Sequence, residues 1–365
     1  MDFLIFDMDG VLLRPMGYHR ALQETVRLAG IATGFGEVQL ADEQIAQFEA
    51  LGISSEWHSS ALCIAVMVLE HQRAAARDNE NSQPVSLNLK DLFEALAGQP
   101  VQDSALQRGL AAIEGLAAQS GVPVELVREL VSKSESIQHS PTLNWFQELI
   151  LGSENYTSIY QKEPQFHTES YLQRYDERQL KEAQAGKVVS WAGGAGHGAA
   201  IMTNRPSRGP SGFSGMPDAE LGAQLVGLAA LPLVGKGEII WLAAQTGRPV
   251  ESFSKPTWKH ALAAILVASG WPAEESLKFV GQQPAEWKIS ALHFLRDSKV
   301  TVFEDTPGGL VAVQEAADLL NGLGLQVGVQ KIGIAEEVAK QSTLSAQGAA
   351  VYSDINQALA SLEDF

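Results

Sequence analysis

The sequence has little cysteine and comparatively little positive charge. Its 365 residues include one cysteine, Cys63, which excludes an intramolecular disulfide and which we expect to be a buried apolar residue. Lysine and arginine total 26 against 43 aspartates and glutamates, a formal net charge of -17. Because nucleic-acid binding depends on basic side chains that neutralise phosphates, this balance argues against a nucleic-acid partner.

Long apolar segments are also missing. No apolar run reaches the ~18 residues that are needed to cross a bilayer, and the acidic start lacks the pattern of a signal peptide. We therefore expect no membrane partner and a cytoplasmic location. A hydrophobic content of 45% with 19% charged residues is typical of a globular protein, and the length suits two domains of roughly 100 to 200 residues each.

The first twelve residues, MDFLIFDMDGVL, contain the most informative local pattern. An apolar run, Phe3 to Phe6, ends in Asp7, and Asp9 and Gly10 follow. A short apolar run closed by a glycine is typical of a buried strand in a parallel sheet, and ligands of such sheets bind outside the carboxyl ends of the strands. The pattern therefore places two carboxylates where chemistry is expected, so that one could attack while the other moves a proton.

Three later segments also carry polar side chains at the end of a predicted strand or loop. AIMTN ends in Thr203 and Asn204, SFSKPTW contains Lys255, and VTVFEDTPGG contains Glu304 and Asp305. Between and after them, apolar strand-like runs alternate with helical patterns. This alternation predicts an α/β fold with a doubly wound parallel sheet.

Together the four segments resemble, in order, the motifs of the haloacid dehalogenase (HAD) superfamily. The resemblance is closest to its beta-phosphoglucomutase and phosphoglycolate phosphatase branch, through DMDGVL, SKPTWKHALAAILVASGWPAEESL and FEDTPGGLVAVQEA. It covers the core and very little of the long region between the first two motifs. It implies a Rossmann-like core with a large helical cap that is inserted after the first strand.

The resemblance also implies a role for each of these residues. Asp7 would take a phosphoryl group as nucleophile, and Asp9 would be the general acid and base. Since members that dehalogenate lack an acid at that second position, Asp9 favours phosphoryl transfer. The implied catalytic residues are Asp7, Asp9, Thr203 and Lys255; the implied phosphate-binding residues are Gly10, Thr203, Asn204 and Lys255; the implied magnesium site comprises Asp7, Asp9 (through its carbonyl), Glu304 and Asp305.

Electrostatics favours a bound metal at such a site. Two carboxylates ~4 Å apart repel by about 4 kcal/mol at an effective dielectric of 20. Asp7, Glu304 and Asp305 together with an incoming phosphate exceed what Lys255 alone can offset. A hard divalent cation with oxygen ligands, such as magnesium, balances this charge.

The sequence predicts two domains. Residues 1–15 and 186–365 are expected to form the core, and residues 16–185 the helical cap. Amphipathic periodicity predicts helices in that region at Tyr18 to Gly30, Ala41 to Leu51, Ser59 to Arg77, Leu89 to Ala97, Ser104 to Ser120 and Pro123 to Ser132. Further strands are expected at Val250 to Phe253, Leu325 to Val329 and Ala349 to Tyr352.

These observations favour a magnesium-dependent phosphatase that hydrolyses a small phosphorylated metabolite through an aspartyl-phosphate intermediate. The alternatives are a sugar-phosphate mutase of the beta-phosphoglucomutase type and a non-catalytic HAD-fold binding or regulatory protein. Arg14, His19, Arg205 and Lys259 are candidates for contacting the substrate. Both a monomer and a homodimer are compatible with the sequence.

Overall fold

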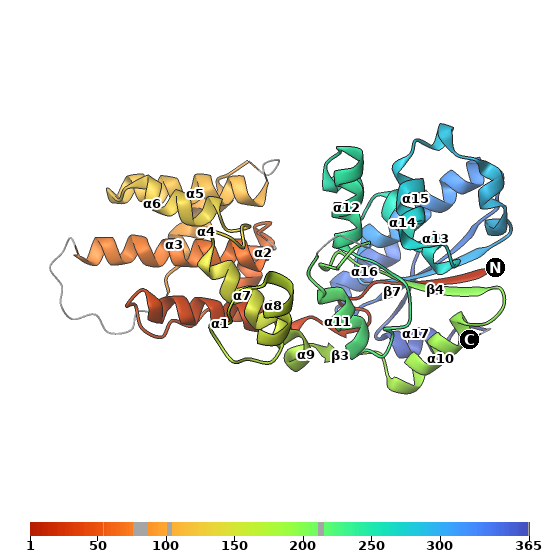
Figure 1. Cartoon of the computed structure of the whole chain (residues 1–365), viewed down its shortest axis with the longest axis horizontal. Helices are drawn as coiled ribbons and strands as arrows, with labels where there is room; N and C mark the ends of the chain where they lie inside the picture. The colour runs from red at the N-terminus through yellow and green to blue at the C-terminus, as the bar shows by residue number, and fades with distance from the viewer. Residues whose placement is uncertain (54, 76–86, 101–103, 211–214, 364) are drawn as a thin grey trace. The chain divides into compact units, whose positions relative to one another are not determined.

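The computed structural model describes residues 1–53, 55–75, 87–100, 104–210, 215–363 and 365. The chain forms two compact units, one made of Met1–Pro15 with Asp176–Phe365 and the other of Met16–Tyr175 (Figure 1). The predicted insertion after the first strand is therefore present. Its second boundary falls between residues 175 and 176 instead of between 185 and 186. We refer to the first unit as the core unit and to the second as the helical unit.

A parallel sheet forms the centre of the core unit, as predicted. Among the described residues it has six strands in the order β5-β4-β1-β6-β7-β8, and every pairing is parallel. The strands are β1 (Asp2–Phe6), β4 (His197–Met202), β5 (Leu233–Val234), β6 (Lys299–Glu304), β7 (Gly328–Ile334) and β8 (Ala350–Tyr352). Since β1 lies between β4 and β6, the chain reverses its direction of travel across the sheet beside β1. Ligands bind at this position in doubly wound folds.

Helices cover both faces of the sheet, which explains why β1 is a continuous apolar run. Phe3 and Ile5 face a cluster made with α12 to α15, whereas Leu4 and Phe6 face a cluster made with α10, α11 and α17 (Figure 1). The helices are α10 (Glu182–Ala192), α11 (Asp218–Leu225), α12 (Lys236–Thr246), α13 (Trp258–Ala268), α14 (Ala273–Gly281), α15 (Pro307–Gly322), α16 (Val338–Ala346) and α17 (Ile355–Ala360). Short 3₁₀ helices occur at η1 (Val250–Ser252), η2 (Pro284–Glu286) and η3 (Ile289–Leu295).

Two short strands lie where the chain leaves and re-enters the core unit. β2 (Leu13–Arg14) pairs antiparallel with β3 (Glu177–Arg178), with Leu13 opposite Arg178 and Arg14 opposite Glu177. The two crossings of the chain are thus hydrogen-bonded to each other within the core unit.

Within the described residues, the helical unit matches the predicted helices within a few residues; the end predicted at Arg77 lies outside the described residues. In its central helix, α3, residues 61–67 are all buried, and Cys63 among them is fully buried, as expected. Burial raises the pKa of the Cys63 thiol, so it is poorly suited to act as a nucleophile. The helices of this unit are α1 (Met16–Ala32), α2 (Asp42–Ala50), α3 (Glu56–Ala75), α4 (Lys90–Ala97), α5 (Ala105–Ser120), α6 (Val124–Ser132), α7 (Pro141–Leu151), α8 (Ser153–Tyr160) and α9 (Tyr171–Tyr175).

Two predicted strands differ from the structure. The segment Val250 to Phe253 is not a strand: it contains the 3₁₀ helix η1, which begins directly after Pro249. The strand predicted at Leu325 to Val329 lies further along the chain, as β7 (Gly328–Ile334). Within the described ranges, no helix combines the length and the apolar character that crossing a membrane requires.

Candidate active site

Asp7 directly follows β1 and lies beside the end of β6. Phe6 pairs in register with Phe303, so Asp7 is adjacent to Glu304, the last residue of β6. The Asp7 amide donates to the Phe303 carbonyl at 2.9 Å. Asp7 Oδ1 accepts from the Met8 amide at 2.8 Å, and Asp7 is 6% exposed. The backbone therefore fixes this carboxylate at the carboxyl edge of the sheet.

Lys255 lies between two of the predicted site carboxylates. It is in the turn that follows η1, and its Nζ is 2.9 Å from Asp7 Oδ1 and 2.9 Å from Glu304 Oε1. Nζ also donates to the Met202 carbonyl at the end of β4, at 3.3 Å. Burial alone lowers the pKa of Lys255, but the charges of Asp7 and Glu304 outweigh it and leave the pKa raised. Lys255 therefore carries its positive charge at neutral pH.

Asp7, Glu304 and Asp305 form a carboxylate cluster at this edge. Each offers one oxygen, and these oxygens all lie within 4.8 Å of one another. Burial, followed by the charge of Asp7, raises the pKa of both Glu304 and Asp305, although Lys255 and Lys340 oppose the shift. A set of oxygen ligands this close together fits a hard divalent cation such as magnesium.

Two glycines allow the backbone to approach these carboxylates. Gly10 has a φ of +73°, and a β-carbon there would lie 2.2 Å from Asp305 Oδ2. Gly309, in the first turn of α15, would place a β-carbon 1.6 Å from Glu304 Oε1. Both positions therefore require glycine in the observed packing. The predicted role of Gly10 in binding phosphate stays a prediction.

The Asp9 carboxylate is held by Arg205. Arg205 Nε donates to both carboxylate oxygens of Asp9, at 2.8 and 3.0 Å, and Nη2 lies 2.6 Å from Oδ1. Nη2 is also 2.9 Å from Asp176, a buried acid. Arg205 was predicted as a substrate contact, but its side chain is 2% exposed and engages two acids of the protein. The role of the Asp9 carbonyl in binding magnesium stays a prediction.

Thr203 and Asn204 follow β4, beside β1, as predicted. The Thr203 amide donates to the Val234 carbonyl at 3.1 Å, and Thr203 Oγ1 accepts from the Arg205 amide at 3.1 Å. Thr203 is buried and Asn204 is exposed. Thr203 therefore contacts, within one loop, the backbone of the arginine that holds Asp9.

The other predicted substrate contacts have partners elsewhere. Arg14 of β2 is 3.7 Å from Glu177 of β3, and both side chains are more than half exposed. His19 is 3.1 Å from Glu49 within the helical unit. The ammonium of Lys259 lies over two aromatic rings, at 4.5 and 5.6 Å from their centroids. None of these contacts indicates a substrate.

Three residues near the site were not predicted. Lys340 of α16 forms an ion pair with Asp305, and Asp176 forms one with Arg205. Nδ1 of His260 in α13 accepts a hydrogen bond from the Lys255 amide. The sequence around Asp176 and Lys340 contains no motif that could have indicated them. His260 could have been noticed, because it lies five residues after Lys255 in the segment that resembles the superfamily motif.

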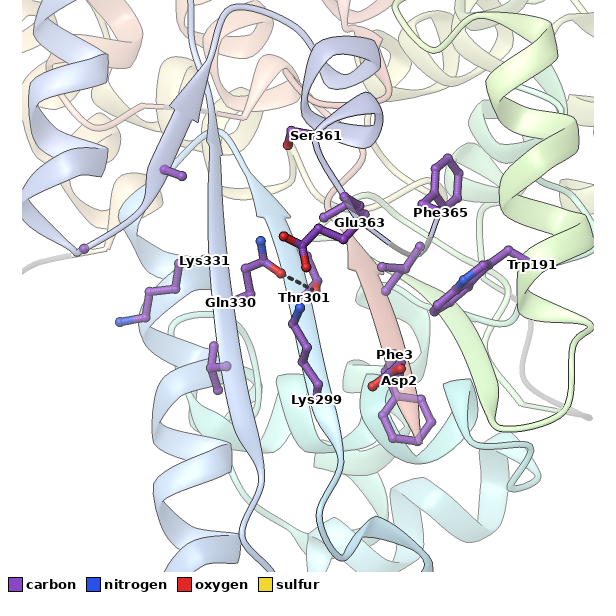
Figure 2. A pocket seen from close by; sticks show the side chains of 15 residues that line it. Asp2, Phe3, Trp191, Lys299, Thr301, Gln330, Lys331, Ser361, Glu363 and Phe365 are labelled. Atoms are coloured by element: carbon purple, nitrogen blue, oxygen red, sulfur yellow. Dashed lines mark hydrogen bonds between the residues drawn. The ribbon is translucent and has the colours of Figure 1, made fainter.

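A separate hollow of about 610 Å³ lies at the opposite end of the strands (Figure 2). Asp2, Lys299 and Thr301 of its lining come from the amino-terminal parts of β1 and β6, and Thr301 donates to Gln330 of β7 at 3.3 Å. Among the described residues, none of the predicted site residues lines it. It is therefore distinct from the carboxylate cluster.

Similarity to one solved structure supports the fold. No protein-family model matches the sequence, and no curated protein matches it either. The X-ray structure of Northeast Structural Genomics Consortium target ZR25 is similar over 99% of this chain and 98% of its own, with a TM-score of 0.67 at 16% identity. Phosphatase Tt82 from Thermococcus thioreducens is similar over 94% of this chain and 99% of its own, with a TM-score of 0.48 at 12% identity. At these identities we take the function from the side chains of the site itself.

Proposed function

We propose that the protein is a magnesium-dependent phosphatase of the HAD type that hydrolyses a small phosphorylated metabolite. The main support is the position of Lys255, whose ammonium lies 2.9 Å from each of Asp7 and Glu304, with Asp305 beside them. Three segments that are far apart in the sequence thus bring an aspartate, a lysine and two further acids to one edge of the sheet, where Asp7 would be the nucleophile. The helical unit would then serve as the cap.

In this proposal Asp7 is the nucleophile. An ionised aspartate needs no base to activate it, and the contacts of Oδ1 with Lys255 and the Met8 amide fix the rotation of the carboxylate. An oxygen of Asp7 attacks phosphorus, the bond from phosphorus to the ester oxygen breaks, and the departing oxygen takes a proton from Asp9. The result is an acyl phosphate on Asp7 and a free alcohol.

The second half of the reaction regenerates the enzyme. Asp9 accepts a proton from a water molecule as the water oxygen attacks phosphorus. The bond between phosphorus and the Asp7 oxygen breaks, which releases inorganic phosphate and restores both side chains. Over both halves, one ester and one water give one alcohol and one phosphate.

Charge neutralisation in this scheme depends on Lys255 and on magnesium. The oxygens of Asp7, Glu304 and Asp305 would hold magnesium, together with the Asp9 carbonyl. When bound, magnesium supplies positive charge that lowers the repulsion between the carboxylates and an incoming phosphate. Lys255 would neutralise further charge, and Thr203 with the Asn204 backbone would donate hydrogen bonds to the phosphoryl oxygens.

The first prediction tests the nucleophile. Asp7→Asn keeps the size of the side chain but removes its charge, so hydrolysis of an aryl phosphate in the presence of magnesium should fall by at least about 10³-fold. The matched control is Asp2→Asn at the other end of β1, which should keep wild-type activity. Circular dichroism should show that both variants are folded.

Other outcomes of this assay would change the assignment. Normal hydrolysis by Asp7→Asn would exclude Asp7 as nucleophile. If the wild-type protein cleaves no phosphate ester in a metabolite panel, the non-catalytic alternative is favoured. Isomerisation of a sugar phosphate without phosphate release would instead identify a mutase.

A further inference from the structure

The loop after β4 contains an arginine, Arg205, whose side chain contacts two acids of the core unit. Nε of Arg205 donates to both carboxylate oxygens of Asp9, and Nη2 lies near Oδ1; the three distances are between 2.6 and 3.0 Å. A guanidinium edge that holds both oxygens fixes the orientation of a carboxylate, because its donors are planar and rigid. Asp9 is 35% exposed at its side chain and would otherwise be able to change rotamer.

Arg205 is itself held in place. Its side chain is 2% exposed, and Nη2 contacts Asp176, whose side chain is fully buried. Its amide donates to Thr203 Oγ1 at 3.1 Å, and its carbonyl accepts from the Lys236 amide at 2.8 Å. Because a buried guanidinium is stable only when it is paired, Asp176 keeps Arg205 at this position.

The two acids lie next to the paired strands that carry the chain out of the core unit and back. Asp9 lies shortly before β2, and Asp176 directly precedes β3. Arg205 therefore bridges both crossings, in addition to the hydrogen bonds between β2 and β3. Such an arrangement supports a carboxylate through a second layer of contacts, which precise proton transfer requires.

We propose that Arg205, anchored by Asp176, is a positioning residue for Asp9. This inference rests on the proposed function, in which Asp9 protonates the leaving group. Arg205 holds the carboxyl group of Asp9 where the departing ester oxygen can take the proton that Asp9 carries. In this proposal Arg205 acts through Asp9 and not on the phosphoryl group itself.

The test compares two substrates that differ in their need for a proton. An alkyl phosphate requires protonation of its leaving oxygen, whereas p-nitrophenyl phosphate has a leaving group that departs without it. In Arg205→Met, kcat/KM for the alkyl phosphate should fall by about 10² or more, which is the usual contribution of a general acid. For p-nitrophenyl phosphate the decrease should stay within about threefold. We use kcat/KM because it covers only the steps up to departure of the leaving group.

Two further variants make the result interpretable. Arg205→Lys keeps the buried charge but cannot hold both Asp9 oxygens and Asp176. It should fold and should show a loss with the same selectivity for the alkyl phosphate but a smaller size, about tenfold. Arg208→Met removes an exposed arginine from the same loop and should change neither rate. Equal losses for both substrates in either Arg205 variant, or no loss at all, would overturn the proposal.

A crystal structure of Arg205→Met separates this inference from the proposed function. If the wild-type protein hydrolyses neither ester, the proposed function fails, and the orientation of Asp9 decides on the positioning role. An Asp9 carboxylate that keeps its orientation without the arginine contradicts the positioning role, and one that moves or becomes mobile supports it. Should Arg205→Met fail to fold, Arg205→Lys takes its place in this measurement.

Discussion

The charged side chains around the end of β1 include more acids than cations. Ion pairs link five carboxylates to only three cations. The acids are Asp7, Asp9, Asp176, Glu304 and Asp305, and the cations are Lys255, Arg205 and Lys340. With all of them ionised, this leaves an excess of two negative charges, which a single divalent cation would neutralise. Burial and the charge of Asp7 raise the pKa of Glu304 and Asp305, so these acids gain from a cation, and this argument for the proposed metal does not depend on the sequence resemblance.

Gly309 provides a test of how tightly the carboxylate cluster is packed. A β-carbon at this position would lie 1.6 Å from Glu304 Oε1, and Glu304 is fully buried. Gly309→Ala should therefore destabilise the protein by about 1–3 kcal/mol, the usual cost of overpacking. Denaturant unfolding measures this change, and magnesium titration should show weaker binding in the variant.

The control for this prediction is on the same helix. Gly322 is the last residue of α15, and a β-carbon there would meet nothing within 4 Å. Gly322→Ala should leave magnesium binding unchanged and should be neutral or stabilising by up to about 1 kcal/mol. A Gly309→Ala variant that is as stable as Gly322→Ala would show that Glu304 can move away.

At the scale of elements, His260 connects the Lys255 turn to the sheet. Its Nδ1 accepts from the Lys255 amide at 3.3 Å, and its Nε2 lies 3.0 Å from the Val234 carbonyl at the end of β5. The neutral imidazole, protonated on Nε2, satisfies both contacts. Burial, followed by the charge of Lys255, lowers the pKa of His260 to about 4, while Asp7 partly opposes the shift.

This lowered pKa predicts a loss of stability in mild acid. The unfolded histidine titrates near 6.5 and the folded one near 4, so the unfolded state binds the proton first as the pH falls. The contribution is complete above pH 6.5 and is lost progressively between about 6.5 and 4, by roughly 3 kcal/mol. In His260→Gln, denaturant unfolding should depend less on pH in this range. An unchanged slope would contradict the prediction.

The elements that the sequence predicted best are those with a continuous apolar run or a regular apolar period. β1 is apolar on both faces, and the helices of the helical unit carry regular apolar positions, so both were predictable. β7 was displaced in the prediction because Gln330 and Lys331, in its middle, line the hollow in Figure 2 and contribute no apolar signal. β5 has two residues, Leu233 and Val234, which is too short for any periodicity.

Most residues of the candidate site that were predicted follow strands; Lys255, which follows the 3₁₀ helix η1, was predicted from the resemblance of its segment. Asp7, Thr203 and Asp305 come directly after β1, β4 and β6, so a strand pattern indicated them. Lys340 and Asp176 reach the site through ion pairs across long stretches of sequence. Such pairs depend on how helices and loops pack, which local patterns do not encode.

At the scale of the whole molecule, the second boundary of the insertion was predicted too late. α10 (Glu182–Ala192) is a helix like those of the helical unit, and the sequence pattern does not distinguish it from them. In the structure it packs on the sheet, through Ala185 and Val188. The chain therefore returns to the core unit at Asp176, before this helix begins.

The described hydrophobic clusters around the sheet are built from residues of the core unit. Within the described ranges, both clusters that sandwich the sheet consist of residues from Met1–Pro15 and Asp176–Phe365. In addition, Arg14 and Glu177 lie opposite each other in the β2–β3 pair. A short loop between these strands could therefore replace the whole helical unit.

This geometry predicts that the core unit folds alone. In a variant with Gly-Gly in place of residues 16–175, Pro15 and Asp176 flank the glycines, and Asp176 can still engage Arg205. The variant should unfold cooperatively on heating and keep the near-ultraviolet circular dichroism of packed tryptophans. A control that breaks the sheet core, Phe6→Asp in the same background, should lose both signals. If the shortened protein unfolds without cooperativity, the helical unit contributes to the stability of the sheet, and the division into two independent cores is wrong.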